Sequence, residues 1–301
     1  MYHQLNLCLE KILADEPVAL TDWPQDYVLS DFNLVEKAGQ IRFVQPPACL
    51  DAQKIQSHLT DMNTTILRAV DSTNTYLMNL ADPLHQSLCS ADIQVGGRGR
   101  RGRQWLSPFA RNLAISVGFA TRRELSELGG LSLVAGLALV DVLQSLGIAE
   151  AGLKWPNDVL VGGRKVCGIL VELRSVNDRV EVVIGFGVNV QLHDAEIAQI
   201  DQPVTDLRRQ GVKLDRTELL LLFVARLRQY VAHFDEAGFD SFVPAFDAVH
   251  VFQAQQCRLV AGDSVTLGEV LGVAPDGGLR VQTEQGEEVF HGGEVSLRRA
   301  S

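Results

Sequence analysis

The chain has 301 residues, with 27 basic and 37 acidic side chains and a formal net charge of −10. Hydrophobic residues make up 46% and charged residues 21%, proportions that are typical of globular proteins and exclude a disordered one. The acidic excess argues against a general nucleic-acid binder, because Lys and Arg supply most of the non-specific affinity for phosphate backbones. The longest stretch without a charge, 128–140, is shorter than the roughly 20 residues of a membrane span, so none is expected.

The cysteines and the first residues of the chain bear on its compartment. The five cysteines are odd in number and widely scattered, with no CxxC pair. No basic region precedes an apolar run at the N-terminus, so a secretory signal is not expected. We therefore predict a cytoplasmic protein with reduced thiols. The absence of HExxH, of a clustered Cys/His set and of GxSxG argues against structural zinc and a serine nucleophile elbow.

Residues 1–58 are expected to form a short N-terminal segment. One helix is predicted at 5–14, and residues 39–44 are predicted to form one side of a hairpin. The segment contains four basic and eight acidic residues, which gives it a net charge of −4.

Residues 59–252 alternate between strand and helix patterns and are expected to form the main domain. Strands are predicted at 65–70, 91–95, 112–119, 159–161, 166–173 and 180–186, and helices at 73–80, 130–146 and 215–234. Gly162 and Gly163 separate two apolar runs, which predicts an antiparallel hairpin with positive φ at both turn positions. Residues 253–301 have turn patterns at 261–263, 275–278 and 285–287, which predicts a β module of about five strands.

The densest chemical signal is a glycine-rich stretch, Gly96–Trp105, that holds Arg98, Arg100, Arg101 and Arg103. The interleaved glycines allow close approach of the backbone, while guanidinium and N–H groups converge on an anion, either phosphate or carboxylate. The stretch also matches the GxGxxG dinucleotide fingerprint, but that motif must open a helix, and here Gln-Trp-Leu-Ser-Pro follows. A solvated or nucleic-acid-binding run of arginines is the other alternative.

A second candidate is Lys154–Asp158, with the sequence KWPND, which precedes Lys165 on the returning strand of the predicted hairpin. Pro156 favours an extended or turn conformation in the residue before it, so the Asn and Asp that follow are expected at a strand edge. A carboxylate, an amide and an ammonium group brought together by one hairpin can bind a nucleotide, a metal ion or an amine. An ordinary turn is the alternative interpretation of the pentapeptide.

These stretches occur together and in one order, and in this they resemble the biotin protein ligase family, the biotin–[acetyl-CoA-carboxylase] ligases. The resemblance is strong over about residues 65–190 and weaker to the C-terminus. The stretches that carry it are Asp71–Asn74, Gln94, Gly97–Gly102, Trp105–Pro108, Lys154–Asp158, Gly163–Gly168, Gly185–Asn189 and, more weakly, Gly292–Arg298.

The resemblance implies an α+β fold: a mixed or antiparallel sheet flanked by helices, of the class II synthetase type. Residues 59–252 would be the catalytic biotin- and ATP-binding domain, and 253–301 an SH3-like β-barrel. The implied reaction is a two-step ligation. Biotin and ATP give biotinyl-5′-adenylate and pyrophosphate, and the biotinyl group passes to a lysine of the biotin carboxyl carrier domain of acetyl-CoA carboxylase. Mg²⁺ is expected to bridge the phosphates, and its protein ligands are unknown from the sequence.

The resemblance also assigns site residues. Lys165, Arg98 and Arg100 would bring the two anions together, and Asp158 would position and help deprotonate the acceptor lysine. The residues implied to bind biotin are Ser72, Thr73, Asn74, Gln94, Gly97, Arg98, Gly99, Arg100, Lys165 and Gly168. The residues implied to bind ATP are Arg100, Arg101, Trp105, Asn157, Lys165, Asn189 and Arg298. Ordinary core packing is an equal alternative for Trp105.

Some family members begin with a winged helix-turn-helix that represses biotin genes, and residues 1–58 resemble a degenerate or truncated remnant of it. The sequence predicts no second and third helix joined by a short turn, and the segment is acidic, so DNA binding is not expected. A biotin-responsive repressor and a lipoate or octanoyl ligase are the alternative functions. Edge-to-edge homodimers occur in the family, and the sequence leaves the oligomeric state open.

Overall fold

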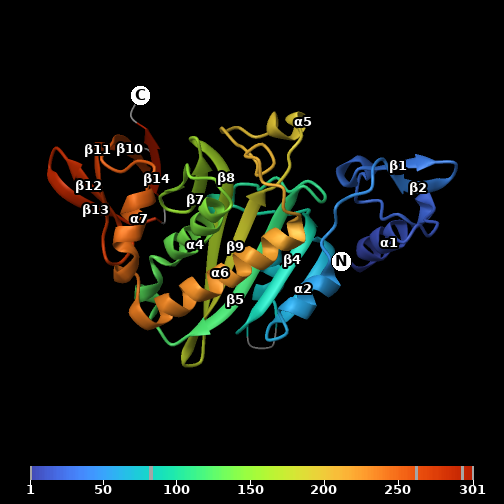
Figure 1. The fold of residues 1–301 in the computed structure, drawn as a ribbon, viewed down its shortest axis with the longest axis horizontal. Helices are drawn as coiled ribbons and strands as arrows, with labels where there is room; N and C mark the ends of the chain where they lie inside the picture. The colour runs from blue at the N-terminus through green and yellow to red at the C-terminus, as the bar shows by residue number, and fades with distance from the viewer. Residues whose placement is uncertain (1, 81–83, 262–263, 293–294, 300–301) are drawn as a thin grey trace.

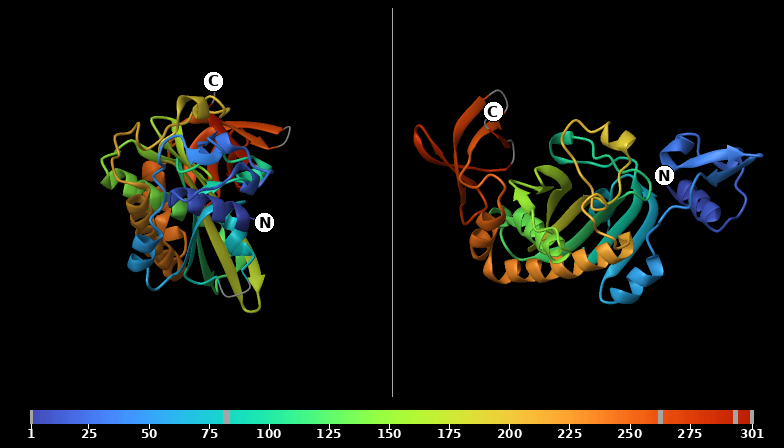
Figure 2. Two further views of the ribbon diagram at one scale, coloured as in Figure 1. Left: turned by 90° about the vertical axis from the view of Figure 1, so that its right-hand side faces the viewer. Right: turned by 45° about the horizontal axis from the view of Figure 1, so that its top comes forward.

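The protein is described by a computed structural model, which covers residues 2–80, 84–261, 264–292 and 295–299. Three parts lie in a row: an N-terminal segment, a large sheet with its helices, and a small β module (Figure 1). A tilted view shows the same row (Figure 2, right). Residues 262–263 of the predicted turn at 261–263, and residues 293–294 of the closing stretch Gly292–Arg298, lie outside the described residues.

The helices and strands follow one another in the order that Figure 1 labels. The helices are α1 (His3–Leu13), α2 (Ala52–His58), α3 (Thr73–Met78), α4 (Leu131–Ser145), α5 (Asp194–Ile197), α6 (Arg216–Ala237) and α7 (Val243–Val249). The strands are β1 (Leu34–Lys37), β2 (Gln40–Phe43), β3 (Asn63–Val70), β4 (Ser87–Gln94), β5 (Asn112–Thr121), β6 (Ala151–Lys154), β7 (Asp158–Val161), β8 (Arg164–Val176), β9 (Arg179–Asn189), β10 (Gln256–Ala261), β11 (Ser264–Val273), β12 (Leu279–Thr283), β13 (Gly286–Phe290) and β14 (Val295–Arg299).

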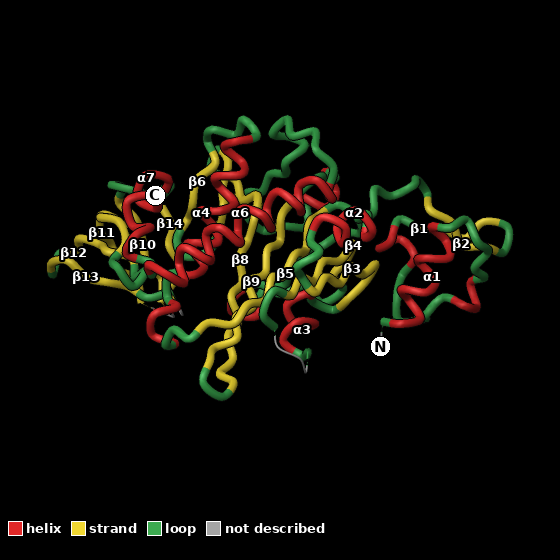
Figure 3. Tube along the Cα trace, turned by 60° about the horizontal axis from the view of Figure 1, so that its bottom comes forward, coloured by secondary structure: helices red, strands yellow, loops and turns green. Residues whose placement is uncertain are grey.

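The middle part is built on a seven-stranded sheet in the order β3-β4-β5-β9-β8-β7-β6. β3 and β4 run parallel, and every other neighbouring pair runs antiparallel. This mixed sheet with its flanking helices confirms the predicted α+β class. Gly162 and Gly163 have φ values of 55° and 73°, so the predicted β7–β8 turn is also confirmed. The β8–β9 hairpin extends beyond the rest of the sheet (Figure 3).

Several elements differ from the sequence prediction; α5 and α7, for example, were not predicted. β4 begins at Ser87, ahead of the predicted 91, because buried serines interrupt its apolar pattern; the Ser90 hydroxyl is satisfied by donating to Ala114 O at 2.7 Å. β6 was not predicted, because its Ala-Gly-Leu-Lys sequence has low strand propensity and gains its stability from pairing with β7. α2 was not predicted either, although Asp51 caps it by accepting from Lys54 N at 2.9 Å.

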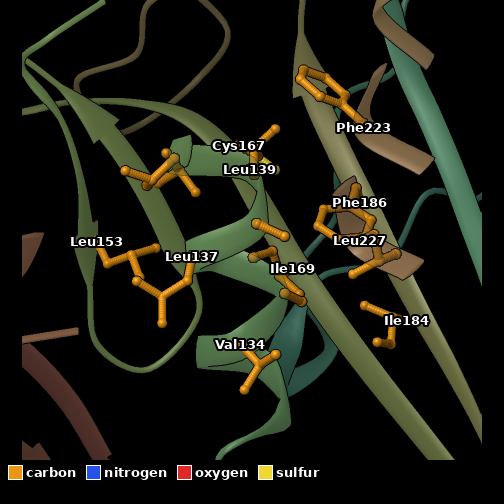
Figure 4. Packing of buried hydrophobic residues seen from close by; sticks show 14 of the residues in the cluster. Val134, Leu137, Leu139, Leu153, Cys167, Ile169, Ile184, Phe186, Phe223 and Leu227 are labelled. Carbon is orange, nitrogen blue, oxygen red and sulfur yellow. The ribbon is translucent and has the colours of Figure 1, made fainter. Parts of the chain in front are cut away.

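α4 is apolar over most of its surface because it packs on β6, β7 and β8 of the sheet and also against α6. Figure 4 shows Val134 and Leu137 of α4 in the same cluster as Leu153 and Ile169 of the sheet. Gly136 permits the close approach, since a Cβ at this position would lie 2.5 Å from Leu153 Cδ2. The stretch Leu125–Ser145 is long and apolar enough to cross a membrane by composition alone, yet 67% of its apolar window is buried inside the protein. That burial explains the composition.

The N-terminal segment has its own cluster of buried residues and docks on β3, one edge of the sheet. Asn6 of α1 takes the place of a neighbouring strand: its side-chain oxygen accepts from Arg68 N and Ala69 N, both at 2.9 Å. Its side-chain nitrogen donates to Ala69 O at 2.8 Å. Leu50 and Ile55, also before residue 58, pack in the main core instead. The domain boundaries at 58 and 252 stay predictions.

The C-terminal module is a five-stranded antiparallel sheet in the order β13-β12-β11-β10-β14, in agreement with the predicted small barrel. Its turn before β12 packs against the start of α4. A Cβ at Gly277 would lie 2.6 Å from Gly130 Cα. Trp155, which is 1% exposed, donates its indole N–H to Gly277 O at 3.1 Å. The module therefore holds the KWPND turn from one side.

Candidate active site

One cavity of about 600 Å³ collects most of the predicted site residues. Those on its wall are Ser72, Thr73, Asn74, Gln94, Arg98, Gly99, Arg100, Arg101, Trp105, Asn157, Asp158, Lys165, Gly168 and Asn189. Gly97 and Arg298 are not on the wall. Gly97 lies behind it, where a Cβ would be 2.5 Å from Trp105 O, and Arg298 is exposed on β14.

The floor of the cavity is a pair of glycines on adjacent strands. Residues alternate between the two faces of a strand, so the side chains that pack on α4 and α6 are interleaved with the floor positions. Gly168 of β8 is paired with Gly187 of β9, and Leu170 with Gly185. The Trp105 indole covers the first pair: a Cβ at Gly187 would lie 2.4 Å from its Cε2. Because Gly168 and Gly187 have no side chains, the Trp105 indole can lie directly on the two strands.

Trp105 packs on the sheet, as the core alternative predicts, and its role in binding ATP stays a prediction. It is half-buried against the sheet, and it is part of the cavity wall. Its indole nitrogen is buried and has no hydrogen-bond partner among the described residues. The Lys165 ammonium lies 5.4 Å from the ring centroid, within the range of a cation–π contact.

The glycine–arginine loop is a small hairpin, held by Gly99 N donating to Arg103 O at 2.7 Å and Trp105 N donating to Gly97 O at 2.9 Å. Arg101 and Gly102 have φ values of 58° and 69°, which turn the chain at its tip. The loop leads from β4 into the antiparallel strand β5 without opening a helix longer than one 3-10 turn. The dinucleotide-fingerprint alternative is therefore wrong.

Lys165 and Asp158 form an ion pair at the centre of the site. The Lys165 Nζ to Asp158 Oδ1 distance is 2.7 Å, and the two side chains are 14% and 17% exposed. The backbone of Lys165 is also fixed, because its N–H donates to Pro203 O and its carbonyl accepts from Thr205 N, both at 2.9 Å. The segment that supplies these bonds also brings residues 199–202 to the cavity wall.

Asn157 connects the KWPND turn to the arginine loop. Its side-chain nitrogen donates to Ile169 O at 2.7 Å, and its side-chain oxygen accepts from Arg100 Nη1 at 3.1 Å. Asn189 is buried and donates to Thr205 O at 3.1 Å. Hydrogen bonds thus join the turn to the loop, and join β8 and β9 to the segment around 203–205.

Thr73, Asn74 and Gln94 form a hydrogen-bonded cluster of uncharged groups on the cavity wall, next to the Arg98–Glu172 ion pair. Gln94 Oε1 accepts from Thr73 N at 2.8 Å and from Thr73 Oγ1 at 3.1 Å. The buried hydroxyl of Ser116 lies 2.7 Å from Thr73 Oγ1 and 2.6 Å from Asn74 Oδ1. Ser72 accepts from Thr75 N and begins α3. These groups can recognise an uncharged polar ligand group.

The cavity wall is cationic although the protein is acidic. Its charged residues are Arg98, Arg100, Arg101, Arg103, Lys154 and Lys165, against Asp158 and Asp201. Burial lowers the pKa of the Lys154 ammonium, opposed by Asp158 and reinforced by the charges of Lys165, Arg298 and Arg103. Burial and the charge of Arg101 likewise lower the pKa of the Arg100 guanidinium. The site is therefore suited to anions.

The contributors missed from the sequence include Lys154, Ser116, Glu172 and the wall residues at 199–202. Lys154 belongs to the quoted KWPND motif, and its position on the wall could have been proposed from that. Ser116 and Glu172 are single residues within apolar strands, and they reach the site only through sheet pairing and folding. Glu172 accepts from Asn74 Nδ2 at 2.8 Å and from Arg98 Nη2 at 3.1 Å.

Comparisons with known proteins agree with this geometry. The profile of the Biotin/lipoate A/B protein ligase family matches residues 66–189, and that of the Biotin protein ligase C terminal domain matches residues 255–298. The chain is 35% identical over 258 residues to the bifunctional ligase/repressor BirA of Salmonella typhimurium, covering 85% of this chain and 81% of that protein. It is 32% identical over 240 residues to the biotin–[acetyl-CoA-carboxylase] ligase of Paracoccus denitrificans, covering 76% and 98%.

A solved structure shares the fold. The biotin protein ligase from Aquifex aeolicus in complex with biotin and ATP superposes with a TM-score of 0.67 at 30% sequence identity, covering 79% of this chain and 99% of that one. The resemblance found in the motifs thus extends over both the sheet domain and the C-terminal module. The chain belongs to the biotin protein ligase family.

Proposed function

We propose that this chain is an ATP-dependent biotin protein ligase, which forms biotinyl-5′-AMP from biotin and ATP and transfers the biotinyl group to a lysine of a biotin carboxyl carrier domain. The observation that supports this best is one cavity with two chemically distinct ends. The neutral amide of Asn74 lies over Gly185, whereas the Lys165 ammonium and the Trp105 indole lie over Gly168 and Gly187, further along the same two strands. Biotin has the matching form, with an uncharged ureido ring at one end and a carboxylate at the other.

In the first step a biotin carboxylate oxygen forms a bond to the α-phosphorus of ATP, and the bond from that phosphorus to pyrophosphate breaks. Both reactants are anions, so the main contribution required of the protein is to hold them together against their repulsion. Arg98, Arg100 and Lys165 are the proposed donors to these anions. Trp105 and Asn189 are proposed on the nucleotide side, and Arg298 is proposed there as a long-range charge near Lys154.

In the second step the amine of the carrier lysine attacks the acyl carbon of the adenylate, an amide bond forms, and AMP leaves. The amine must first lose a proton. Asp158 is the proposed acceptor, and its 2.7 Å pair with Lys165 suggests how it becomes available. When Lys165 is drawn to the phosphate of the adenylate, the carboxylate is released to receive the incoming ammonium group.

The side chains of this site fit a Mg²⁺ ion only if substrate phosphates and water supply most of its ligands. No group of three or more His, Cys, Asp or Glu side chains converges among the described residues. Mg²⁺ usually keeps several waters and binds substrate phosphates, so few protein ligands are needed. We propose that Asp158 and Asp201, the carboxylates of the cavity wall, would hold its waters. When bound, it would neutralise phosphate charge and favour the departure of pyrophosphate.

The acetyl-CoA carboxylase carrier domain is the proposed acceptor, because the name of the Paracoccus relative specifies this carboxylase. A DNA-binding role is not proposed, since the apolar side of α1 is buried and residues 1–58 are acidic. None of the five cysteines, all of them among the described residues, is in a disulfide, which supports a cytoplasmic location. A homodimer stays a prediction.

Asp158→Asn separates the two steps. The wild type and the variant are each given purified biotinyl-5′-AMP and a carrier domain, without ATP, and the rate of carrier labelling is measured. We expect the variant to transfer biotin at least about tenfold more slowly, because it has lost the proton acceptor. Asp178→Asn, an exposed position in the β8–β9 turn, is the matched control. An unchanged transfer rate in Asp158→Asn would show that this carboxylate is not the acceptor.

A further inference from the structure

Glu172 contacts two residues of the cavity wall, Asn74 and Arg98, without being on the wall itself. It follows Gly168 and Leu170 at the same two-residue spacing on β8, so it faces the same side of the sheet. Its Oε2 accepts from Asn74 Nδ2 at 2.8 Å, and its Oε1 accepts from Arg98 Nη2 at 3.1 Å. The side chain is 26% exposed, so the ion pair is only partly open to water.

We propose that Glu172 is a positioning residue for biotin, which orders Arg98 and Asn74 before the ligand arrives. The inference rests on the proposed function, since both partners are proposed there to bind biotin. Glu172 itself touches no reacting atom. It acts by fixing the side chains that do.

The amide end of the contact is tightly constrained. Asn74 is 3% exposed, its Nδ2 also donates to Leu170 O at 3.1 Å, and its Oδ1 lies 2.6 Å from Ser116 Oγ. A Cβ at Gly185 would lie 2.1 Å from Asn74 Oδ1, so the amide has no room to move towards β9. The Glu172 carboxylate accepts a further hydrogen bond from Nδ2 and so fixes the orientation of the Asn74 amide.

The guanidinium end depends more strongly on Glu172. The Arg98 side chain is 49% exposed, and its bonds among the described residues all involve Nη2: to Glu172 and, at 3.0 Å, to Thr75 Oγ1. The other two guanidinium nitrogens remain available to a ligand anion. A free arginine loses rotamer entropy when it is ordered, and the pair with Glu172 means that Arg98 has lost part of that entropy before biotin binds.

Glu172→Gln tests the proposal, because it keeps an acceptor for Asn74 and removes the charge that orders Arg98. Pyrophosphate release by the full chain is measured while biotin and ATP are varied in turn. We expect the KM for biotin to rise about three- to tenfold, with kcat and the KM for ATP nearly unchanged, as for a partly exposed ion pair. Trypsin should also cut the 98–103 loop faster in the ligand-free variant, because the loop is less ordered.

Two further variants complete the test. Glu287→Gln removes an arginine–glutamate pair of 2.7 Å on the remote β12–β13 hairpin and should change nothing measured here. Thr75→Val removes the second partner of Arg98 and should shift the biotin KM in the same direction by less. An unchanged or lowered biotin KM in Glu172→Gln, or an equal loss in kcat, overturns the proposal. If the wild type itself does not activate biotin, the proposed function fails, and the trypsin comparison alone decides the role of Glu172.

Discussion

Two glycines of β9 allow the two ends of the cavity to be perturbed separately. Gly185 and Gly187 lie two residues apart and face the same side of the sheet. A Cβ at Gly185 would lie 2.1 Å from Asn74 Oδ1, and a Cβ at Gly187 would lie 2.4 Å from Trp105 Cε2. Each alanine substitution therefore displaces one side chain, from opposite ends of the proposed site.

The size of each effect follows from these contacts. Carbon and oxygen atoms need more than 3 Å, so Asn74 or Trp105 must move by about 1 Å, and overpacking of this kind costs about 1–3 kcal/mol. Since 1.36 kcal/mol corresponds to a factor of ten, ground-state binding should weaken by about five- to 150-fold. Asn74 is held by three partners and cannot yield without losing them, so Gly185→Ala should be near the upper end.

The assay is pyrophosphate release with one substrate varied and the other saturating. Gly185→Ala should raise the KM for biotin more than that for ATP, and Gly187→Ala should do the reverse. Each variant is the control for the other, because the chemical change and the strand are the same. Thermal melting of both checks that they fold. If both substitutions raise the same KM, or if neither changes any KM, the assignment of the two ends is wrong.

The remaining predictions concern the parts that hold the site. Trp155→Phe removes the only indole donor to Gly277 O recorded among the described residues and should cost about 1–3 kcal/mol in a denaturant titration; no loss would mean that the C-terminal module does not fix this turn. Arg216→Met breaks a 2.6 Å pair with the fully buried Asp92, which keeps Arg68 as a partner at 2.7 Å, and should destabilise the fold by about 1–3 kcal/mol; no loss would show that Arg68 alone compensates Asp92. Burial lowers the pKa of His250 to about 4 from 6.5. As the pH falls, His250 therefore takes up a proton in the unfolded state before it does so in the folded state. The free energy of unfolding should fall between pH 6.5 and 4 by about 3 kcal/mol more in the wild type than in His250→Phe. Parallel pH profiles for the two proteins would contradict this.

The sequence predicts those features that depend on neighbouring residues. The Gly162–Gly163 turn, the apolar α4 and the antiparallel course of β7 and β8 all follow from local pattern. The arginine loop and the KWPND turn were predicted as candidate sites for the same reason. Their mutual hydrogen bond, from Arg100 to Asn157, joins residues 57 positions apart and no local pattern indicates it.

Features that depend on distant contacts could not be predicted. Glu172 lies 98 positions from Asn74, and within an apolar strand it has no sequence signal of its own. Ser116 is similar, since a buried serine in a strand becomes informative only when its hydroxyl is seen beside Asn74. The hydrogen bonds between the Asn6 side chain and the edge of β3 could not be predicted either, because the partners are more than 60 positions away in the chain.

The central claim is tested most directly by giving the purified chain a biotin carboxyl carrier domain, ATP and Mg²⁺ with either biotin or lipoate, and measuring the intact mass of the carrier. The account predicts the addition of one biotinyl group, only when ATP is present and only when the acceptor lysine is intact, and no comparable addition of lipoyl. Labelling with lipoate in preference to biotin, or no ATP-dependent labelling at all, would contradict it.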